Sequence, residues 1–350
     1  MIDRVSVAFV PVYQNPYQHL LTNALQGQDI DVIHLKSMPT YAWLLQQRRK
    51  VHVIHLHWLS GLYMHRFCTP LQLGNFLVKI LLAKKLGYKI IWTVHNILPH
   101  KLPFPPMHYL VRRFIMHQAD EVISHCEFGR KEITRLFPRN KSVHVIPIGN
   151  YNNVYTTTVD REQARNFLNI PAQSFVYLFL GNIEQYKGIE TFVDTFRLSA
   201  GENDIALIAG RNRAPKLVIS LHAMTQIDSR IRIHARFIPD EEIQYFLRSA
   251  NVMVLPFREI LTSSSVITGM SYEIPIIAPS LGCLPELITP EAGILYNNQD
   301  PTSLLQAMQL IKTLDTDKMG KAAKAITDRL SWMTIAQQTA KIYRQCIRNG

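Results

Sequence analysis

Cysteines, long apolar runs and, in the first half, acidic residues are scarce in this sequence of 350 residues. Its four cysteines lie far apart and form no CxxC pair, so we expect no metal site and a reducing, cytoplasmic environment. No run of about 18 uncharged apolar residues occurs, which argues against a membrane-spanning helix. The opening MIDRVSVAFVPVY is typical of a short strand rather than of a secretion signal.

Acidic residues are scarce only in part of the chain. Residues 1–150 contain 18 Lys and Arg against 7 Asp and Glu, a net charge of +11, whereas residues 151–350 contain 20 against 19, a net charge of +1. A strongly basic half attracts polyanions, either nucleic acid or the anionic surface of a membrane. We therefore expect an anionic partner for the first half rather than a merely solvated surface.

What the sequence does have is a regular alternation of short Val- and Ile-rich runs with stretches long enough for a helix. The pattern predicts strands over 5–10, 31–35, 51–57, 89–95, 121–125, 142–148, 175–181, 204–210, 230–235, 251–256, 274–279 and 293–296. Such alternation is typical of βαβ units and parallel sheets. The apolar content of 47% and the length suit two ordinary globular domains.

A polar stretch at 149–171, ending in a short predicted helix at 161–168, separates the two series of strands. We therefore predict an α/β protein of two tandem Rossmann-like, doubly wound domains that face each other across a cleft, where a ligand binds. The first domain covers residues 1–155 and the second 156–330. An amphipathic helix at 330–347 follows, and we assign residues 331–350 to the first domain.

Two segments of the second domain carry the chemistry. GNIEQYKG (181–188) places Lys187 just after one predicted strand, and FREILTSSSVITGMSYEIP (257–275) places an acid and hydroxyls just after another. Both lie at carboxyl ends of strands, where open α/β sheets bind ligands. A helix N-terminus with free N–H groups, Ser and Thr hydroxyls and a nearby cation suits a diphosphate. The residues thus indicate a nucleotide-linked substrate.

These motifs resemble a known family. LPFREILTSSSVITGMSYEIPIIAPSLGCLPELI is similar to the donor-site segment of family 4 retaining glycosyltransferases of GT-B architecture, and LGNIEQYKGIETFVDTF to their glycine–lysine turn. FIPDEEIQYFLRSANVMVLPF resembles the stretch before that segment. In the first half, IIWTVHNILPH and NPYQHLLTNAL resemble bacterial members that build exopolysaccharides and related glycans. The resemblance runs from Val5 to about Arg344.

The resemblance implies a hexosyltransferase that uses a UDP- or GDP-sugar donor, without a metal or other cofactor, and retains the anomeric configuration. The donor is held mainly by the second domain. The acceptor, a polysaccharide or polyprenyl-linked glycan, is held by the first domain, and the final helix crosses back onto that domain. The protein is then expected in the cytoplasm, at the inner face of the plasma membrane, in peripheral contact through its basic first domain.

Three residues are the expected catalytic set. Lys187 would contact the donor diphosphate, and Glu259 matches the first glutamate of the family's Glu-x7-Glu motif, which accepts hydrogen bonds from sugar hydroxyls. His95 ends a predicted strand and would meet the donor sugar. The second glutamate of the motif is absent, because Ile267 or Thr268 falls at its position. Without the resemblance, the simpler interpretation is that Lys187 is an exposed lysine of a turn. Glu259 would then be an acid that stabilises the helix dipole.

Further residues are expected around the donor. Asn182 stands where the family usually has an arginine, so Arg211 or Arg258 would supply a second cation. The full set of donor contacts that we predict is Asn182, Arg211, Arg258, Thr262, Ser263, Ser264, Ser265 and Gly269. Ordinary N-capping accounts for one of the four hydroxyl residues at 262–265, so the run of four exceeds what a cap needs. Gly269 also suits close helix packing.

On the acceptor side we predict contacts from Asn15, Tyr17, Gln18, His57 and Asn96, all just after predicted strands. A plain turn explains the first three almost as well, since Pro11 and Pro16 stiffen that segment. His100 is a weaker second histidine candidate.

A predicted helix at 71–86 carries an apolar face flanked by Lys79, Lys84, Lys85 and Lys89. Together with the segment 101–113, which contains Lys101 and the apolar Phe104, it is typical of a surface that contacts a membrane interface. Packing of this helix against the core is the competing interpretation.

Three other functions remain open from the sequence. A sugar-nucleotide epimerase of the same fold needs two or three acids in the cleft, and only Glu259 is well placed. A nucleic-acid-binding protein would account for the basic half, but no RNA-binding signature is present, so we expect no specific nucleic-acid partner. A catalytically impaired homologue would account for Asn182 and the missing glutamate.

Overall fold

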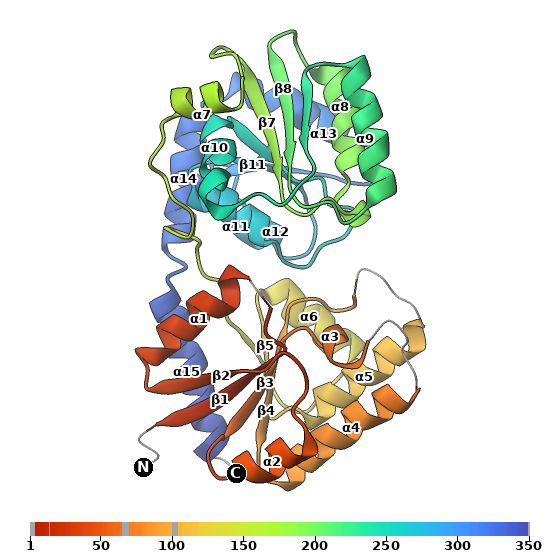
Figure 1. Ribbon diagram of the computed structural model, residues 1–350, viewed down its shortest axis with the longest axis vertical. Helices are drawn as coiled ribbons and strands as arrows, with labels where there is room; N and C mark the ends of the chain where they lie inside the picture. The colour runs from red at the N-terminus through yellow and green to blue at the C-terminus, as the bar shows by residue number, and fades with distance from the viewer. Residues whose placement is uncertain (1–3, 14, 65–69, 100–103, 349–350) are drawn as a thin grey trace. The chain divides into compact units, whose positions relative to one another are not determined.

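The computed structural model describes residues 4–13, 15–64, 70–99 and 104–348. Its contacts divide the chain into two compact units (Figure 1). The first unit runs to Gly149 and includes the chain from Leu330 onward, and the second unit runs from Asn150 to Arg329. The sequence pattern had placed the boundary at residue 155, six residues later.

The first unit is built on six parallel strands in the order β2-β1-β3-β4-β5-β6. The strands are β1 Val5–Val10, β2 Ile30–His34, β3 Val53–Leu56, β4 Lys89–Val94, β5 Glu121–Ser124 and β6 Val143–Val145. Its described helices are α1 Pro16–Gln26, α2 Tyr41–Gln47, α3 Ser60–Tyr63, α4 Pro70–Lys85, α5 Pro105–Gln118, α6 Glu127–Leu136 and α15 Trp332–Arg348. Strands β3 and β4 are almost wholly buried, as expected of a parallel sheet covered by helices on both faces.

The last helix returns to the first unit, as expected. Helix α15 packs beside α1, and the Tyr343 hydroxyl of α15 lies 2.7 Å from His55 Nδ1 of β3. Gly149 provides room for the start of this helix, because a Cβ there would lie 2.4 Å from the Trp332 ring. The first unit is therefore completed by a helix that follows the whole of the second unit in sequence.

The second unit repeats the plan with the strand order β12-β11-β10-β7-β8-β9, again all parallel. Its strands are β7 Phe175–Leu180, β8 Asp204–Ala209, β9 Ile231–His234, β10 Val252–Val254, β11 Ile276–Pro279 and β12 Gly293–Tyr296. Its helices are α7 Arg161–Phe167, η1 Gln185–Lys187, α8 Ile189–Ser199, α9 Pro215–Ile227, α10 Asp240–Ser249, α11 Ser264–Ser271, α12 Leu284–Leu287, α13 Ser303–Leu310, η2 Ile311–Thr313 and α14 Thr316–Asp328.

The predicted fold class is confirmed: each unit is a doubly wound α/β domain, and all twelve predicted strands are present with shifts of a few residues at their ends. In each sheet β1 or β7 lies in the interior, and the strand order reverses beside it. Loops leaving the carboxyl ends of strands at such a reversal are where open α/β sheets bind ligands.

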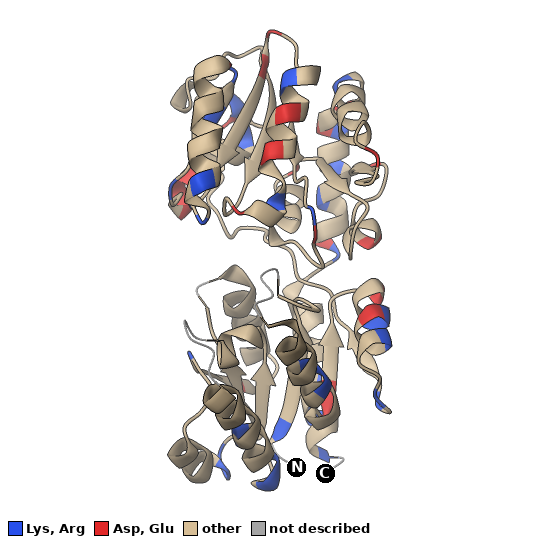
Figure 2. Ribbon diagram, turned by 90° about the vertical axis from the view of Figure 1, so that its right-hand side faces the viewer, with Lys and Arg blue, Asp and Glu red and all other residues tan. Residues whose placement is uncertain are grey.

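Lys and Arg outnumber Asp and Glu clearly in the first unit, whereas both kinds are mixed in the second (Figure 2). In the part of the chain that the structure describes, no helix has the length and hydropathy needed to cross a membrane.

Candidate active site

Lys187 is a buried cation at the carboxyl end of β7. It closes the short helix η1, and its side chain is 8% exposed. Among the described residues no carboxylate lies within ion-pair distance of its Nζ, whose neighbours include the ring of Phe179, with a centroid 5.8 Å away. Burial lowers the pKa of this amine to about 8, although the field of Glu184 acts in the opposite direction. A buried ammonium with no counterion is suited to an anionic ligand.

A serine hydroxyl and this amine both lie beside Gly181. A Cβ at Gly181 would lie 2.9 Å from Lys187 Nζ and 3.0 Å from Ser265 Oγ, so both polar groups reach the same glycine. Gly181 has φ +147°, a conformation that side chains rarely adopt. The glycine that follows β7 thus leaves a small space that is bounded by an ammonium and a hydroxyl.

Helix α11 begins at this space. Ser263 is its N-cap, and the Ser263 hydroxyl accepts a hydrogen bond from the N–H of Val266 at 3.2 Å. The N–H groups of Ser264 and Ser265, in the first turn, donate to no other described residue. Unpaired N–H groups and the helix dipole favour an anion here. Thr262 precedes the cap and is half-buried.

Other predicted donor residues are more exposed. Glu259 and Asn182 lie on the surface of the loops after β10 and β7. Arg258 is already paired, since its Nη2 lies 2.9 Å from Glu190 Oε2, and Arg211 lies over the ring of Phe237 at 4.8 Å. Of the two proposed second cations, Arg258 would therefore have to leave the carboxylate of Glu190 before it could join Lys187 at a ligand.

Gly269 is a correction to the predicted donor set. It is buried midway along α11, and a Cβ there would lie 2.8 Å from Ile276 Cδ1 and 3.0 Å from Met253 Sδ. It lets the helix approach the sheet closely. Ile267 and Thr268, at the place of the absent second glutamate, are also buried, with 4% and 6% of their surface exposed.

The first unit offers neutral groups instead of cations. His57, His95 and His125 directly follow β3, β4 and β5, so their side chains meet at the carboxyl edge of the sheet. His57 Nδ1 lies 3.1 Å from His95 Nε2, and His95 Nδ1 lies 3.2 Å from His125 Nε2. Burial lowers the pKa of His125 to about 4 and that of the other two well below 6.5.

His95 directly follows the fourth strand, at the predicted strand end, and its ring packs among histidine and aromatic side chains. Both of its ring nitrogens contact neighbouring histidines, and its ring stacks on Trp58 at 4.1 Å. Tyr17 packs edge-on against His95 with centroids 4.9 Å apart, and it is buried. His95 and Tyr17 are wall residues of this edge, whereas His57 keeps one nitrogen, Nε2, without a hydrogen-bond partner among the described residues.

Asn15 and Gln18 are used by the loop after β1. The Asn15 side chain caps α1 by accepting from the N–H of Gln18 at 3.1 Å. The buried Gln18 amide donates to the carbonyl of Pro11 and accepts from the N–H of Tyr13, both at 2.9 Å. We correct the predicted acceptor contacts accordingly, because these side chains hold the loop. Asn96 remains available and lines a small cavity with His57.

Two residues of this edge were missed from the sequence. His125 ends a predicted strand in the same way as His57 and His95, so the shared position was a usable signal. Arg112 lies in the middle of α5 and lines the cavity of His57, a placement that no local pattern indicates. His100 and Lys101 lie outside the described residues.

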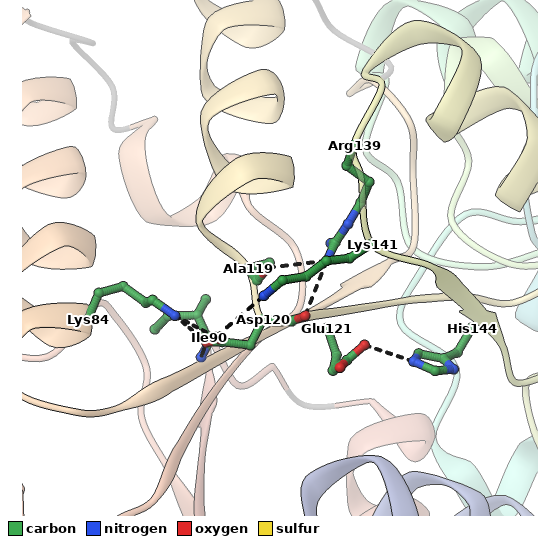
Figure 3. Close-up of polar contacts among 8 residues, drawn as sticks. All are labelled: Lys84, Ile90, Ala119, Asp120, Glu121, Arg139, Lys141 and His144. Carbon is green, nitrogen blue, oxygen red and sulfur yellow. Dashed lines mark hydrogen bonds and ion pairs between the residues drawn. The ribbon is translucent and has the colours of Figure 1, made fainter. Parts of the chain in front are cut away.

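Figure 3 shows Lys84, one of the predicted membrane-facing lysines, beside Asp120. Lys84 Nζ lies 2.5 and 2.6 Å from the two carboxylate oxygens of Asp120, which also accepts from the N–H of Ile90 at 2.8 Å. Lys141 lies 3.9 Å from the same carboxylate. Lys84 is thus part of an ion-pair cluster, and the expectation that it serves a membrane is corrected. Lys85 is exposed.

Another cavity lies elsewhere among the described residues. It measures about 560 Å³ and is bounded in the second unit by α7, α10 and α14, with Arg248 and Tyr272 in its wall. None of the predicted donor residues lines it. Among the described residues, no group of three or more His, Cys, Asp and Glu is arranged to hold a metal ion.

The fold of the two units is that of glycosyltransferases with GT-B architecture. The structure is similar to sucrose-phosphate synthase from Thermosynechococcus elongatus, with a TM-score of 0.80, 20% identity and coverage of 99% of this chain and 100% of that one. It is also similar to Anabaena HepE in complex with UDP and glucose, with a TM-score of 0.76, 14% identity and coverage of 98% and 100%.

Sequence comparison leads to the family. Residues 3–149 match the family described as "Glycosyl transferase 4-like domain", and residues 174–312 match "Glycosyl transferases group 1". With both domains matched in order, the chain belongs to the group 1 glycosyltransferases of GT-B type.

Curated relatives are distant. The D-inositol 3-phosphate glycosyltransferase of Xylanimonas cellulosilytica is 20% identical over 98% of this chain and 82% of its own length. The GDP-mannose:glycolipid 4-beta-D-mannosyltransferase of Xanthomonas campestris pv. campestris is 23% identical over 73% of this chain and 70% of its own length.

Proposed function

We propose that the chain transfers a hexose from a UDP- or GDP-linked donor to a hydroxyl of a lipid-linked or polysaccharide glycan, with retention of configuration and without a metal. In this proposal residues 156–330 hold the donor, and the first domain holds the acceptor. The protein acts in the cytoplasm at the inner face of the plasma membrane and has no specific nucleic-acid partner.

The observation that carries this proposal is the unpaired, buried ammonium of Lys187 beside Ser265 and the first turn of α11. A departing nucleoside diphosphate gains negative charge as the bond to the sugar breaks. One fixed donor at such a charge is worth about 3 kcal/mol of the barrier. A donor diphosphate bound between Lys187, the Ser265 hydroxyl and the free N–H groups of Ser264 and Ser265 would receive that stabilisation.

The remaining roles follow from this placement. Glu259, on the loop that enters α11, would accept hydrogen bonds from sugar hydroxyls. The bond between the anomeric carbon and the acceptor oxygen forms as the bond to the diphosphate breaks, and the acceptor proton passes to the leaving phosphate oxygen. His95 would act through its neighbours, by ordering His57 and stacking on Trp58.

Two of the similar proteins support the choice of substrates. The Anabaena structure contains UDP and glucose, and the Xanthomonas enzyme is named for GDP-mannose and a glycolipid. Both nucleotides fit the proposal, since the diphosphate is the part that Lys187 would bind. The exposed apolar residues of α4, among them Leu71, Val78 and Leu81, support a lipid-linked acceptor at a membrane surface.

The test is ligand-induced stabilisation of the folded protein. UDP, GDP, UDP-glucose and GDP-mannose are each added in a thermal-shift series, and we expect the melting temperature to rise with the conjugates of one base only. That result would identify the donor class, and release of the nucleotide with a glycan acceptor would then establish transfer. A folded protein that responds to none of the four would favour the catalytically impaired homologue.

A further inference from the structure

Another cation is buried with no carboxylate partner among the described residues. Arg112 of α5 is 2% exposed and makes hydrogen bonds only to neutral acceptors. Its Nε donates to the carbonyl of Ile97, and its Nη1 donates to the Tyr63 hydroxyl at 2.7 Å and to the carbonyl of His108 at 3.4 Å. Its Nη2 donates to no described residue. A guanidinium taken out of water is ordinarily paired with an anion.

Arg112 lines a cavity of about 150 Å³. Trp58 and Trp92 contribute its aromatic lining, and Ser60 and Asn96 contribute polar groups. None of the described residues that line it is acidic. The volume corresponds to about five water molecules, at roughly 30 Å³ each, and it is below the range of sites for drug-sized ligands. The cavity thus fits a small anionic group with a few neighbouring atoms.

The cavity is also lined by His57, and the histidine chain determines whether the free nitrogen of His57 donates or accepts. The carbonyl of Ile146 accepts from His125 Nδ1 at 3.0 Å, so that nitrogen carries the hydrogen. In neutral rings, His125 Nε2 must then accept from His95 Nδ1, and His95 Nε2 must accept from His57 Nδ1. The one remaining nitrogen, His57 Nε2, has a lone pair and no hydrogen.

His57 Nε2 is buried and without a partner among the described residues, and His57 lines the cavity. An anion alone would leave that lone pair unsatisfied, whereas a hydroxyl would donate to it. A ligand that carries both groups satisfies both side chains, at a site where an unsatisfied polar atom costs about 1–3 kcal/mol.

We propose that this cavity binds a phosphorylated sugar or polyol, with a phosphate oxygen on Arg112 and a neighbouring hydroxyl donating to His57 Nε2. The assignment of this ligand as the acceptor rests on the proposed function, whereas its binding does not. The phosphate would replace the missing carboxylate of Arg112, and the histidine chain would select compounds with a hydroxyl near the phosphate.

The probe is glycerol 3-phosphate, compared with n-propyl phosphate and inorganic phosphate. Binding is followed through the imidazole nitrogens of ¹⁵N-histidine-labelled protein, because His57 reports on this cavity alone and not on the second unit. We expect the free protein to show His57 as the Nδ1–H tautomer, and glycerol 3-phosphate to shift its Nε2 resonance. We also expect n-propyl phosphate, which lacks the hydroxyls, to bind at least five-fold more weakly.

Arg112→Gln should weaken glycerol 3-phosphate binding at least ten-fold, whereas Arg113→Gln, the same change at the exposed neighbouring residue, should leave it within two-fold. If Arg112→Gln does not fold, the preference of the native protein for glycerol 3-phosphate over n-propyl phosphate decides. The proposal is overturned by an Nε2–H tautomer of His57, by equal affinity for the two phosphate esters, or by full binding in folded Arg112→Gln. Since no nucleotide is present, these results are independent of donor binding.

Discussion

The carboxyl edges of the two sheets treat charge in opposite ways. At the end of β7, Lys187 is buried without a carboxylate and can regain full charge by binding an anion. At the ends of β3, β4 and β5, three buried histidines are bonded to one another and stay neutral. The same strand-end position therefore carries a buried cation in one unit and a chain of neutral histidines in the other.

The difference is one of available hydrogen-bond partners. A neutral imidazole both donates and accepts, so a chain of them anchored on one backbone carbonyl leaves a single nitrogen, His57 Nε2, without a partner among the described residues. An ammonium only donates, and it requires acceptors that the loop after β7 does not supply. At this strand end the second unit thus leaves a buried cation without a counterion, whereas the histidine chain of the first unit leaves one neutral acceptor.

The largest expected effect is acid destabilisation of the first unit. Burial lowers the pKa of His55 to about 3 and of His125 to about 4, and that of His57 and His95 well below 6.5. Because the unfolded chain binds protons first, this contribution to stability is complete above pH 6.5 and is lost as the pH falls toward 4. At pH 5 each of these rings lowers the free energy of unfolding by about 2 kcal/mol relative to pH 7.

Tryptophan fluorescence isolates this effect, since all four tryptophans, Trp43, Trp58, Trp92 and Trp332, belong to the first unit. We expect the urea midpoint of the fluorescence transition to fall steeply between pH 7 and pH 5. The urea midpoint for loss of nucleotide binding, which reports on the second unit, should fall less. A fluorescence midpoint that is the same at both pH values would contradict the neutral histidine chain.

The next effect concerns the buried Lys187 of the second unit. Lys187→Met should weaken nucleoside diphosphate binding by about 10- to 100-fold, because a hydrogen bond to a charged group contributes about 1.5–3 kcal/mol. The same variant should be more stable than the native protein by about 1–3 kcal/mol at pH 7, since it removes a buried cation whose pKa is lowered to about 8. A lysine with a purely structural role would not show these opposite changes.

Calorimetric titration with the nucleotide found by thermal shift, and urea unfolding without it, measure the two quantities. The matched control is Lys216→Met, which removes an exposed lysine of α9 in the same unit. Equal nucleotide affinity in Lys187→Met and the native protein would remove Lys187 from the site.

The strands were predictable because each is a short buried run between polar segments, and the donor loops because a lysine and a run of hydroxyls directly follow such runs. Pairing across the fold was not. Nothing local shows that Arg258 pairs with Glu190, 68 residues away, that Gln18 is consumed by its own loop, or that Arg112 reaches the cavity of His57. Local pattern gives strand ends, whereas side-chain partners depend on tertiary distances.

A smaller effect concerns the pH dependence of nucleotide binding. Since the anion binds the protonated amine and the pKa of Lys187 in the free protein is about 8, affinity should be nearly constant below pH 7 and fall about ten-fold by pH 9. Titrations at pH 6, 7, 8 and 9 measure it. In Lys187→Met the dependence between pH 7 and 9 should disappear, and its persistence there would assign the titration to another group.

The smallest effect separates the lysines of α4. Leu71, Val78 and Leu81 are exposed, and helical spacing places them on one stripe with Lys85. Lys84, by contrast, is held by Asp120.

Lys85→Gln should therefore weaken binding to phosphatidylglycerol vesicles about five-fold, at about 1 kcal/mol per basic residue near the surface. Lys84→Gln should leave vesicle binding unchanged and lower the fluorescence midpoint, because it removes the close ion-pair partner of the largely buried Asp120 carboxylate and leaves Lys141, at 3.9 Å, and the field of Arg139. Equal loss of vesicle binding in both variants would show that the ion pair opens at the membrane and that the first unit uses its whole basic surface there.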